Sequence, residues 1–155
     1  MLRTQFTDQL KQSMHAKDEI ATSTLRLIIA ALQDRDIAAR GKGNREGIPE
    51  DEILSMLQTM IKQRRESIKM YEVGKRFDLV EREAAEIKII ERFLPAQMSD
   101  EDVRAAIDDC IKAVGAAGVK DMGKVMAEMK TRYVGQMDFA KASGQVKDRL
   151  MAVAG

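Results

Sequence analysis

Residues 118–125, with the sequence GVKDMGKV, form a stretch whose spacing is typical of phosphate chemistry. Gly118, four further residues, Gly123 and Lys124 match the phosphate-binding pattern G-x-x-x-x-G-K-[ST] up to its last position. Val125 stands where that pattern needs a hydroxyl group to bind magnesium. A phosphate-binding loop also follows a buried strand, whereas the residues before this segment have the period of a helix. We therefore do not predict nucleotide hydrolysis here.

The start of a helix accounts for most of the same segment. Asp121 is suited to cap a helix by accepting hydrogen bonds from the amides that follow it. Lys124 precedes Glu128 by one helical turn, where the two can pair on a solvated face. Gly123 needs a further reason, because glycine in a helix costs about 1 kcal/mol relative to alanine. Either a packed neighbouring helix or a ligand phosphate approaches the backbone there, and the local residues favour packing.

Residues that commonly carry out catalysis or bind metals are scarce. The chain has one cysteine, Cys110, and one histidine, His15, so it offers neither a zinc-binding cluster nor an internal disulfide. Cys110 falls on a predicted apolar stripe, which favours a buried, inert thiol. Glu83 and Glu86 share one face of a helix, but no nucleophile, metal ligand or oxyanion-binding loop accompanies them. We predict no catalytic residue, no metal site and no cofactor.

The charges are balanced over the whole chain but not along it. Lysine and arginine number 26 and aspartate and glutamate 25, which gives a formal net charge of +1. Residues 96–109 carry five acidic residues and one arginine, whereas residues 110–155 carry eight basic and four acidic residues. The C-terminal third is therefore a modest basic zone with a net charge of +4, the sign expected for contact with a polyanion.

A second group of basic residues lies on a predicted helix nearer the N-terminus. Lys62, Arg65 and Lys69 recur at the spacing of one helix face, opposite a stripe of apolar residues. The ordinary interpretation is a solvated face with local ion pairs, which contribute little to stability. The alternative is a docking face for RNA phosphates or for another protein.

Apolar residues recur every three or four positions along nearly the whole chain, which predicts helices, and no strand-like alternation competes. The expected N-caps are Asp18, Ser99, Asp121 and Asp138. Gly74 is expected to end one helix in the left-handed conformation, and Asp78 with Glu81 is expected to form a capping box for the next. Residues 41–47, GKGNREG, predict a mobile loop. Pro95 is expected to end the last helix of the N-terminal part.

These boundaries predict an all-α protein of two domains. Residues 1–94 form an N-terminal helical bundle, or pair of helical hairpins, of about four helices. Residues 98–151 form a small C-terminal three-helix domain, close to the lower size limit for independent folding. The longest apolar run, LIIAAL at residues 27–32, is too short to span a bilayer, and the N-terminus lacks the apolar core of a signal peptide. We expect a cytoplasmic protein without membrane contact.

Four segments are specific enough for comparison: TLRLIIAALQDRDIAARG, IKQRRESIKMYEVGKR, FLPAQMS and KDMGKVM. Taken together, they resemble the GatB/YqeY family of small bacterial proteins. The resemblance implies an all-helical protein whose C-terminal domain is similar to the tail domain of the B subunit of glutamine-dependent tRNA amidotransferase. In that enzyme the tail is a tRNA-contacting appendage, and ammonia release and ATP-dependent activation occur elsewhere. The parts that catalyse those steps have no counterpart in this chain.

The resemblance also implies which residues contact RNA. Carried over residue by residue, the binding candidates are Lys120, Gly123, Lys124, Gly135 and Lys147, with Lys130, Arg132 and Lys141 as nearby basic residues. In the same segments, Asp121 and Asp138 are expected to be structural, and Val125, Val146 and Leu150 to be core.

These observations favour a noncatalytic accessory protein whose C-terminal helical module engages tRNA or a tRNA-linked enzyme. With four phenylalanines, two tyrosines and no tryptophan, recognition by base stacking is not expected, so contacts would be to phosphate and shape. No contact with DNA is expected. One alternative, by family association, is a component of glutamine-dependent amidotransfer, a carbon–nitrogen ligase with glutamine as amido donor. A second alternative is a protein-interaction adaptor that uses the face of Lys62, Arg65 and Lys69.

Overall fold

The computed structural model describes residues 1–154, with only the backbone described for Ala154. The predicted all-α class is confirmed: within these residues the chain forms seven α-helices and one short 3₁₀-helix. Their bounds are α1 (Leu2–His15), α2 (Glu19–Gly41), α3 (Glu50–Val73), α4 (Phe77–Glu91), α5 (Asp100–Val114), η1 (Val119–Asp121), α6 (Met122–Arg132) and α7 (Phe139–Ala154). The chain divides into two compact units, Met1–Pro95 and the part from Ala96 onward. The assignment of residues 1–94 and 98–151 to two domains stays a prediction.

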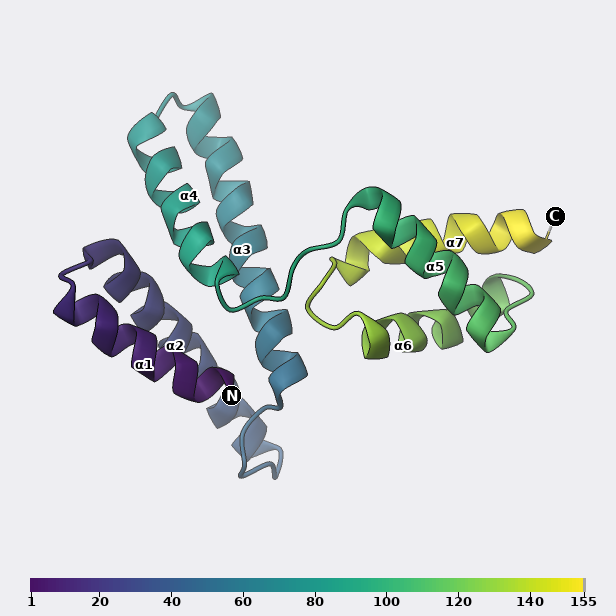
Figure 1. The fold of residues 1–155 in the computed structure, drawn as a ribbon, viewed down its shortest axis with the longest axis horizontal. Coiled ribbons are helices and arrows are strands. Elements are labelled where there is room, and N and C mark those ends of the chain that lie inside the picture. Colours follow the sequence, from purple (N-terminus) through teal and green to yellow (C-terminus); the bar gives the residue numbers. More distant parts are fainter. Residues whose placement is uncertain (155) are drawn as a thin grey trace. The chain divides into compact units, whose positions relative to one another are not determined.

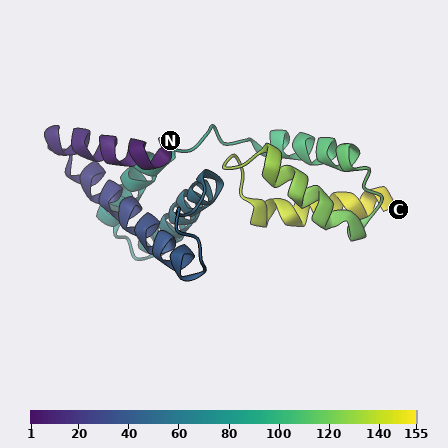
Figure 2. The same cartoon turned by 90° about the horizontal axis from the view of Figure 1, so that it is seen from below.

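The N-terminal unit is built from two helical hairpins. Helix α1 lies beside α2, and α3 lies beside α4 (Figures 1 and 2), while α2 also contacts α3 and α4. Their facing stripes form one core whose fully buried side chains include Phe6, Ile28, Ile53, Leu57 and Ile90. Phe6 of α1 meets Phe93, which follows α4, edge to face with ring centroids 4.9 Å apart. This contact joins the first helix to the end of the unit.

A polar cluster joins α1, α2 and the segment before α3. The guanidinium group of Arg3 donates to Asp36, with Nη2 2.9 Å from Oδ1, and also to the carbonyl of Ile48 at 2.8 Å. Asp36 Oδ1 accepts a further hydrogen bond from the Ile48 amide at 2.9 Å. Gly47 has a φ of +91°, and a Cβ there would lie 2.7 Å from both Arg3 Nη2 and Asp36 Oδ1, so only glycine fits this position.

The C-terminal unit packs α5, α6 and α7 around a second core. Val125, Val146 and Leu150, predicted as core, are fully buried together with Ile107 and Met129. Cys110 is also fully buried in this core, and burial raises the pKa of its thiol, as expected for an inert cysteine.

Several predicted helix ends are confirmed by hydrogen bonds. Asp18 Oδ1 accepts from the Ala21 amide at 3.1 Å, and Ser99 Oγ accepts from the Asp102 amide at 3.1 Å. Asp138 Oδ1 accepts from the Ala140 amide at 3.0 Å at the start of α7. These side chains satisfy amides in the first turn of their helices, which have no partner inside the helix.

The prediction that Gly74 is the left-handed residue at the end of α3 is wrong by one position. Gly74 has a φ of −80°, and the left-handed residue is Lys75 with a φ of 56°. The Arg76 amide donates to the carbonyl of Tyr71 at 2.8 Å, which closes the turn around Lys75 one residue later than expected. Asp78 does not cap α4, because the helix already begins at Phe77 and the Asp78 carboxylate accepts from Arg76 at 3.1 and 3.2 Å.

We expect Asp36→Asn to lower the free energy of unfolding at neutral pH by about 1–3 kcal/mol, because the charged Arg3 would lose its carboxylate partner. Hydrogen bonding from Arg3 holds the pKa of Asp36 below its usual value of 3.8. The stabilisation is therefore complete above the pKa of the unfolded chain and is lost as pH falls through the lower pKa of the folded state.

Urea unfolding followed by circular dichroism at several pH values checks this prediction. The wild-type and Asp36→Asn curves should converge in acid. Asp34→Asn removes an exposed carboxylate of the same helix and should change stability by less than about 0.5 kcal/mol. Equal effects of the two substitutions would contradict the role given to Asp36.

We expect Lys75→Gly to raise the free energy of unfolding by about 0.5–1 kcal/mol, because a side chain in the left-handed conformation is strained. Lys69→Gly is the matched control, since Lys69 is exposed in the interior of α3. There the same substitution should lower stability by about 1 kcal/mol. Thermal denaturation of both variants measures the two shifts, and shifts of the same sign would contradict the assigned turn.

Candidate nucleic-acid interface

The segment with phosphate-loop spacing is a turn between two helices. Gly118 is buried in an extended conformation, Val119–Asp121 form η1, and α6 begins at Met122. Val125 is fully buried in the core. No strand precedes the segment within the described residues, so the buried strand on which a nucleotide-binding loop rests is missing. The spacing of the glycines therefore comes from a helix end, a 3₁₀ turn and a helix start.

The predicted N-cap role of Asp121 is wrong. Its carboxylate turns back and accepts from the amide of Ala117 at 2.9 Å, and it makes no cap hydrogen bond to α6. The physical reason is that η1 leads directly into α6, so the Met122 amide already donates to the carbonyl of Val119. The hydrogen bond from Ala117, and then the charges of Lys124 and Lys120, hold the pKa of Asp121 below its usual value.

Gly123 is not explained by packing, which corrects the expectation drawn from the sequence. A Cβ at this position would meet no heavy atom within 4 Å, and the residue does not have a positive φ. The expected pair between Lys124 and Glu128 is absent as well. Instead, Glu128 accepts from Arg132 Nε at 2.7 Å, one turn further along α6. Gly123 and Lys124 are thus both exposed at the start of α6, with open space beside the backbone.

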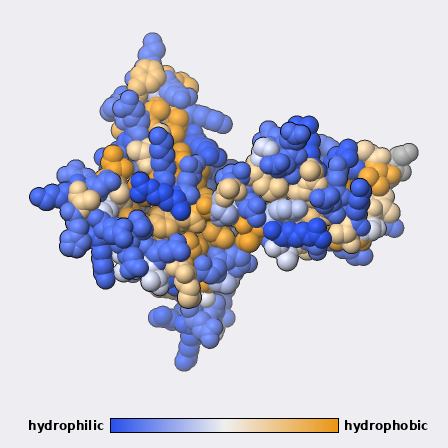
Figure 3. Space-filling view, viewed as in Figure 1, coloured by the Kyte–Doolittle hydropathy of each residue, from blue (hydrophilic) through white to orange (hydrophobic). Residues whose placement is uncertain are grey.

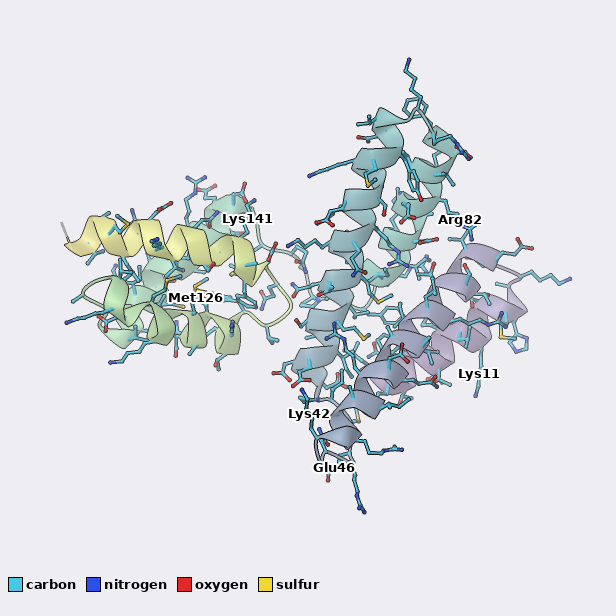
Figure 4. The ribbon with its side chains drawn as sticks, turned by 180° about the vertical axis from the view of Figure 1, so that it is seen from behind. Lys11, Lys42, Glu46, Arg82, Met126 and Lys141 are labelled. Carbon is cyan, nitrogen blue, oxygen red and sulfur yellow. The ribbon has the colours of Figure 1, made fainter. Side chains whose placement is uncertain are left out.

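The remaining basic candidates fall into two groups. Of the candidates named from the sequence, Lys120, Lys124, Lys130 and Lys147 form no ion pair with a described residue, and all four are exposed. By contrast, Lys141 on α7 (Figure 4) lies 3.6 Å from Asp100 of α5, and Arg132 is held by Glu128. Pairing reduces the positive charge that these two side chains offer to a phosphate. We call the four unpaired side chains the lysine surface.

Gly135 has a structural role. It is buried with a φ of +74°, and its carbonyl accepts from Gln97 Nε2 at 2.8 Å. The Met98 amide donates to the neighbouring carbonyl of Gln136 at 3.0 Å. These bonds join the segment before α5 to the turn between α6 and α7. A residue buried in this way has no surface for RNA, so we leave Gly135 out of the candidate interface.

The second basic group lies on α3. Lys62, Arg65 and Lys69 are all exposed, and Arg65 Nη2 is 3.5 Å from Glu91 Oε1. The predicted face therefore exists, although one of its three charges is paired. Its use in docking stays a prediction.

The two carboxylates considered as an acid–base pair belong to the helix packing. Glu86 is buried and accepts from Arg64 Nε at 2.9 Å and from Arg82 Nε at 3.4 Å. Burial, and then the charge of Glu86, raise the pKa of Glu83. Local spacing does not predict the bond from Arg64, because 22 residues separate the two side chains. Among the described residues, no three His, Cys, Asp or Glu side chains group in a way that could hold a metal ion.

Comparison with known proteins identifies the family. A family model described as "Yqey-like protein" matches residues 3–150. The chain belongs to the YqeY-like protein family. The resemblance noted in the sequence is thereby confirmed at the level of the family. The similarity of the C-terminal unit to an amidotransferase tail stays an expectation.

Relatives of this YqeY-like protein occur in yeasts. "Altered inheritance of mitochondria protein 41, mitochondrial" of Saccharomyces cerevisiae strain YJM789 is 30% identical over 126 residues, which are 77% of this chain and 65% of that protein. The protein of the same name from Lachancea thermotolerans is 35% identical over 85 residues, 55% of this chain and 43% of that protein. The Kluyveromyces lactis protein is 34% identical over 87 residues, 56% and 45% of the two chains.

These relatives limit what carries over to the YqeY-like chain. It spans 65% of the length of the Saccharomyces proteins and less than half of the other two. The resemblance alone implies a bacterial protein, but these relatives show that such proteins also occur in yeasts. Their name refers to mitochondria, whereas we expected a cytoplasmic protein, and that location stays a prediction. No helix within the described residues is long and apolar enough to cross a membrane.

We expect Gly123→Ala to leave the fold intact and to raise the free energy of unfolding by as much as about 1 kcal/mol, because alanine is the better helix former. Gly115→Ala is the matched control. A Cβ at Gly115 also meets nothing within 4 Å, but the φ of +64° is strained for alanine. Denaturant titration should show opposite signs for the two substitutions. A destabilised Gly123→Ala variant would indicate crowding at this position.

Proposed function

We propose that this YqeY-like protein is a noncatalytic, tRNA-associated accessory protein whose C-terminal unit contacts the tRNA backbone or a tRNA-linked enzyme. The observation that carries the proposal is the lysine surface, defined above as Lys120, Lys124, Lys130 and Lys147. Unpaired, exposed ammonium groups can bind phosphate oxygens. Each such contact releases counterions from the nucleic acid, which favours binding at low salt. Lys120 and Lys124 flank the turn before α6, and the open space at Gly123 lets a phosphate approach the backbone between them.

The chemistry of the unit supports contact with phosphate and shape more than with bases. Its two aromatic side chains, Tyr133 and Phe139, are partly buried against the core. Neither is fully available for stacking on a splayed base, which is how sequence-specific RNA recognition often proceeds. Contacts to phosphate position a protein on RNA and carry no sequence information directly. The proposal therefore concerns a tRNA-shaped partner and not a particular nucleotide sequence.

An amidotransfer activity rests on family association alone. The chemically active groups considered above have structural positions, since Glu86 is held by two arginines and Cys110 is fully buried. The protein-interaction alternative keeps the exposed Lys62 and Lys69 of α3 as its candidate face. The first alternative predicts amide formation by the purified protein with glutamine, ATP and mischarged tRNA. The second predicts a protein partner that remains bound at high salt.

The test of the proposal is tRNA binding by the triple variant Lys120→Ala, Lys124→Ala and Lys147→Ala. Filter binding at low salt should show association of the wild-type protein with tRNA and at least a tenfold weaker association of the variant. If three phosphate contacts are lost, the slope of log K against log salt should decrease in magnitude by about 2–3. The salt titration thus separates loss of charge contacts from a change in folding.

The matched control is the triple variant Lys11→Ala, Lys42→Ala and Lys88→Ala. These lysines are exposed in the N-terminal unit, where Lys11 and Lys42 extend from its surface (Figure 4). The control changes the net charge by the same amount, so it should bind tRNA as the wild type does, apart from a small uniform effect. Absence of tRNA binding at low salt, or equal losses for both triple variants, would refute the proposal.

A further inference from the structure

The α3–α4 hairpin continues beyond the core of its unit. The buried residues of α3 end at Ile61, and those of α4 begin at Glu86. No side chain of residues 62–85, all of which the structure describes, is buried. Figure 1 shows this part as the free end of the hairpin, which we call the arm (residues 62–85). Among its apolar side chains, Ile68 is partly buried and packs against the core.

The arm is held firmly at its base and at its turn. At the base, buried Glu86 accepts from Arg64 at 2.9 Å and from Arg82 at 3.4 Å. At the turn, the Gly74, Lys75 and Arg76 amides donate to backbone carbonyls of the last turn of α3 at 2.8–3.1 Å. The end of the arm therefore keeps its shape without help from its outermost side chains.

Those outermost side chains are apolar and strongly exposed. Met70 is 75% exposed, Val73 87% and Phe77 60%; Met70 and Val73 lie in the last turn of α3, and Phe77 is the first residue of α4. We call these three residues the apolar tip. In Figure 3 this end of the hairpin shows tan and orange surface between blue side chains. Single exposed apolar residues need no explanation, but three at one convex end indicate a surface that is covered by something else.

The charges around the apolar tip are mixed, with a positive excess. Lys69, Lys75 and Arg76 are exposed, and the acidic residues among them are Glu72 and Asp78. Asp78 is neutralised by Arg76 at 3.1 Å. On the same helix, Lys62 and Arg65 continue the basic stripe toward the core, although Arg65 is paired with Glu91 at 3.5 Å and Glu66 follows it. Lys69 and Lys75, the exposed lysines beside the apolar tip, complement a surface that is anionic outside and apolar beneath.

We propose that the apolar tip inserts into the interface of an anionic lipid bilayer. A bilayer accepts a convex end, whereas a protein partner would need a matching groove. Val73 and Phe77 reach the acyl boundary, and Lys69 and Lys75 remain at the phosphate groups, with their aliphatic stems alongside the apolar side chains. The hydrogen bonds of the turn satisfy its amides before insertion, which lowers the cost of leaving water. The proposal replaces our expectation from the sequence of no membrane contact, which rested on the absence of a long apolar run. The contact does not involve a membrane-spanning helix and does not depend on the proposed RNA contact.

A tryptophan reporter tests the proposal with the full chain, which contains no tryptophan of its own. Phe77→Trp should show a blue-shifted emission when vesicles of phosphatidylcholine and phosphatidylglycerol are added, and a smaller shift with phosphatidylcholine alone. The matched control is Ile37→Trp, at a position on α2 that is 65% exposed. Its emission should not change with either vesicle.

Vesicle flotation provides the second measurement, without the reporter. The double variant Val73→Ser and Phe77→Ser should reduce the fraction bound to anionic vesicles at least fivefold. Leu27→Ser with Ile37→Ser, which are 50% and 65% exposed on α2, should leave it unchanged. The tip variant changes only exposed side chains, and circular dichroism checks that its helix content is retained. Absence of binding to anionic vesicles, equal binding of the two double variants, or an emission change caused by tRNA or protein extract but not by vesicles would overturn the proposal.

Discussion

Each helix of this protein has one apolar stripe, and without a sheet in the described residues that stripe is covered only by other helices. This constraint determines which apolar residues are buried between helices and which remain exposed to solvent. In the N-terminal unit, Phe6 of α1 packs against Phe93, which follows α4, and the two hairpins share one core. In the C-terminal unit, three shorter helices surround Ile107, Met129 and Leu150. Side chains outside these two cores are available for function.

Ion pairs decide which of the basic side chains in the C-terminal unit are available. The acidic helix α5 neutralises part of α7, since Asp100 pairs with Lys141 and Asp108 pairs with Arg149. The candidate lysines that remain unpaired lie on η1, α6 and the middle of α7. Net charge along the sequence therefore identifies the basic region, but the pairing across helices selects the residues within it.

The arm is a consequence of the same packing rule. Helices α3 and α4 are longer than the core that they help to build, so no side chain of their outer parts is fully covered. The buried Glu86 with its two arginine partners marks the boundary between the covered and uncovered parts. Beyond it, apolar residues that would be core in a larger bundle become surface. A small all-helical protein thus acquires two candidate contact surfaces of different chemistry, one of lysines and one of apolar side chains.

The sequence by itself determined the all-α class, three of the helix caps and the family, because apolar periodicity and capping residues act within one or two helical turns. Asp18, Ser99 and Asp138 cap their helices as predicted. Tertiary structure alone decided that Asp121 binds Ala117 and that no neighbour crowds Gly123. It also decided which lysines stay unpaired and which apolar residues remain uncovered. The cross-helix pairs and the uncovered apolar residues depend on contacts between residues far apart in the chain, and the Asp121 bond to Ala117 depends on the 3₁₀ turn that replaces the expected helix start.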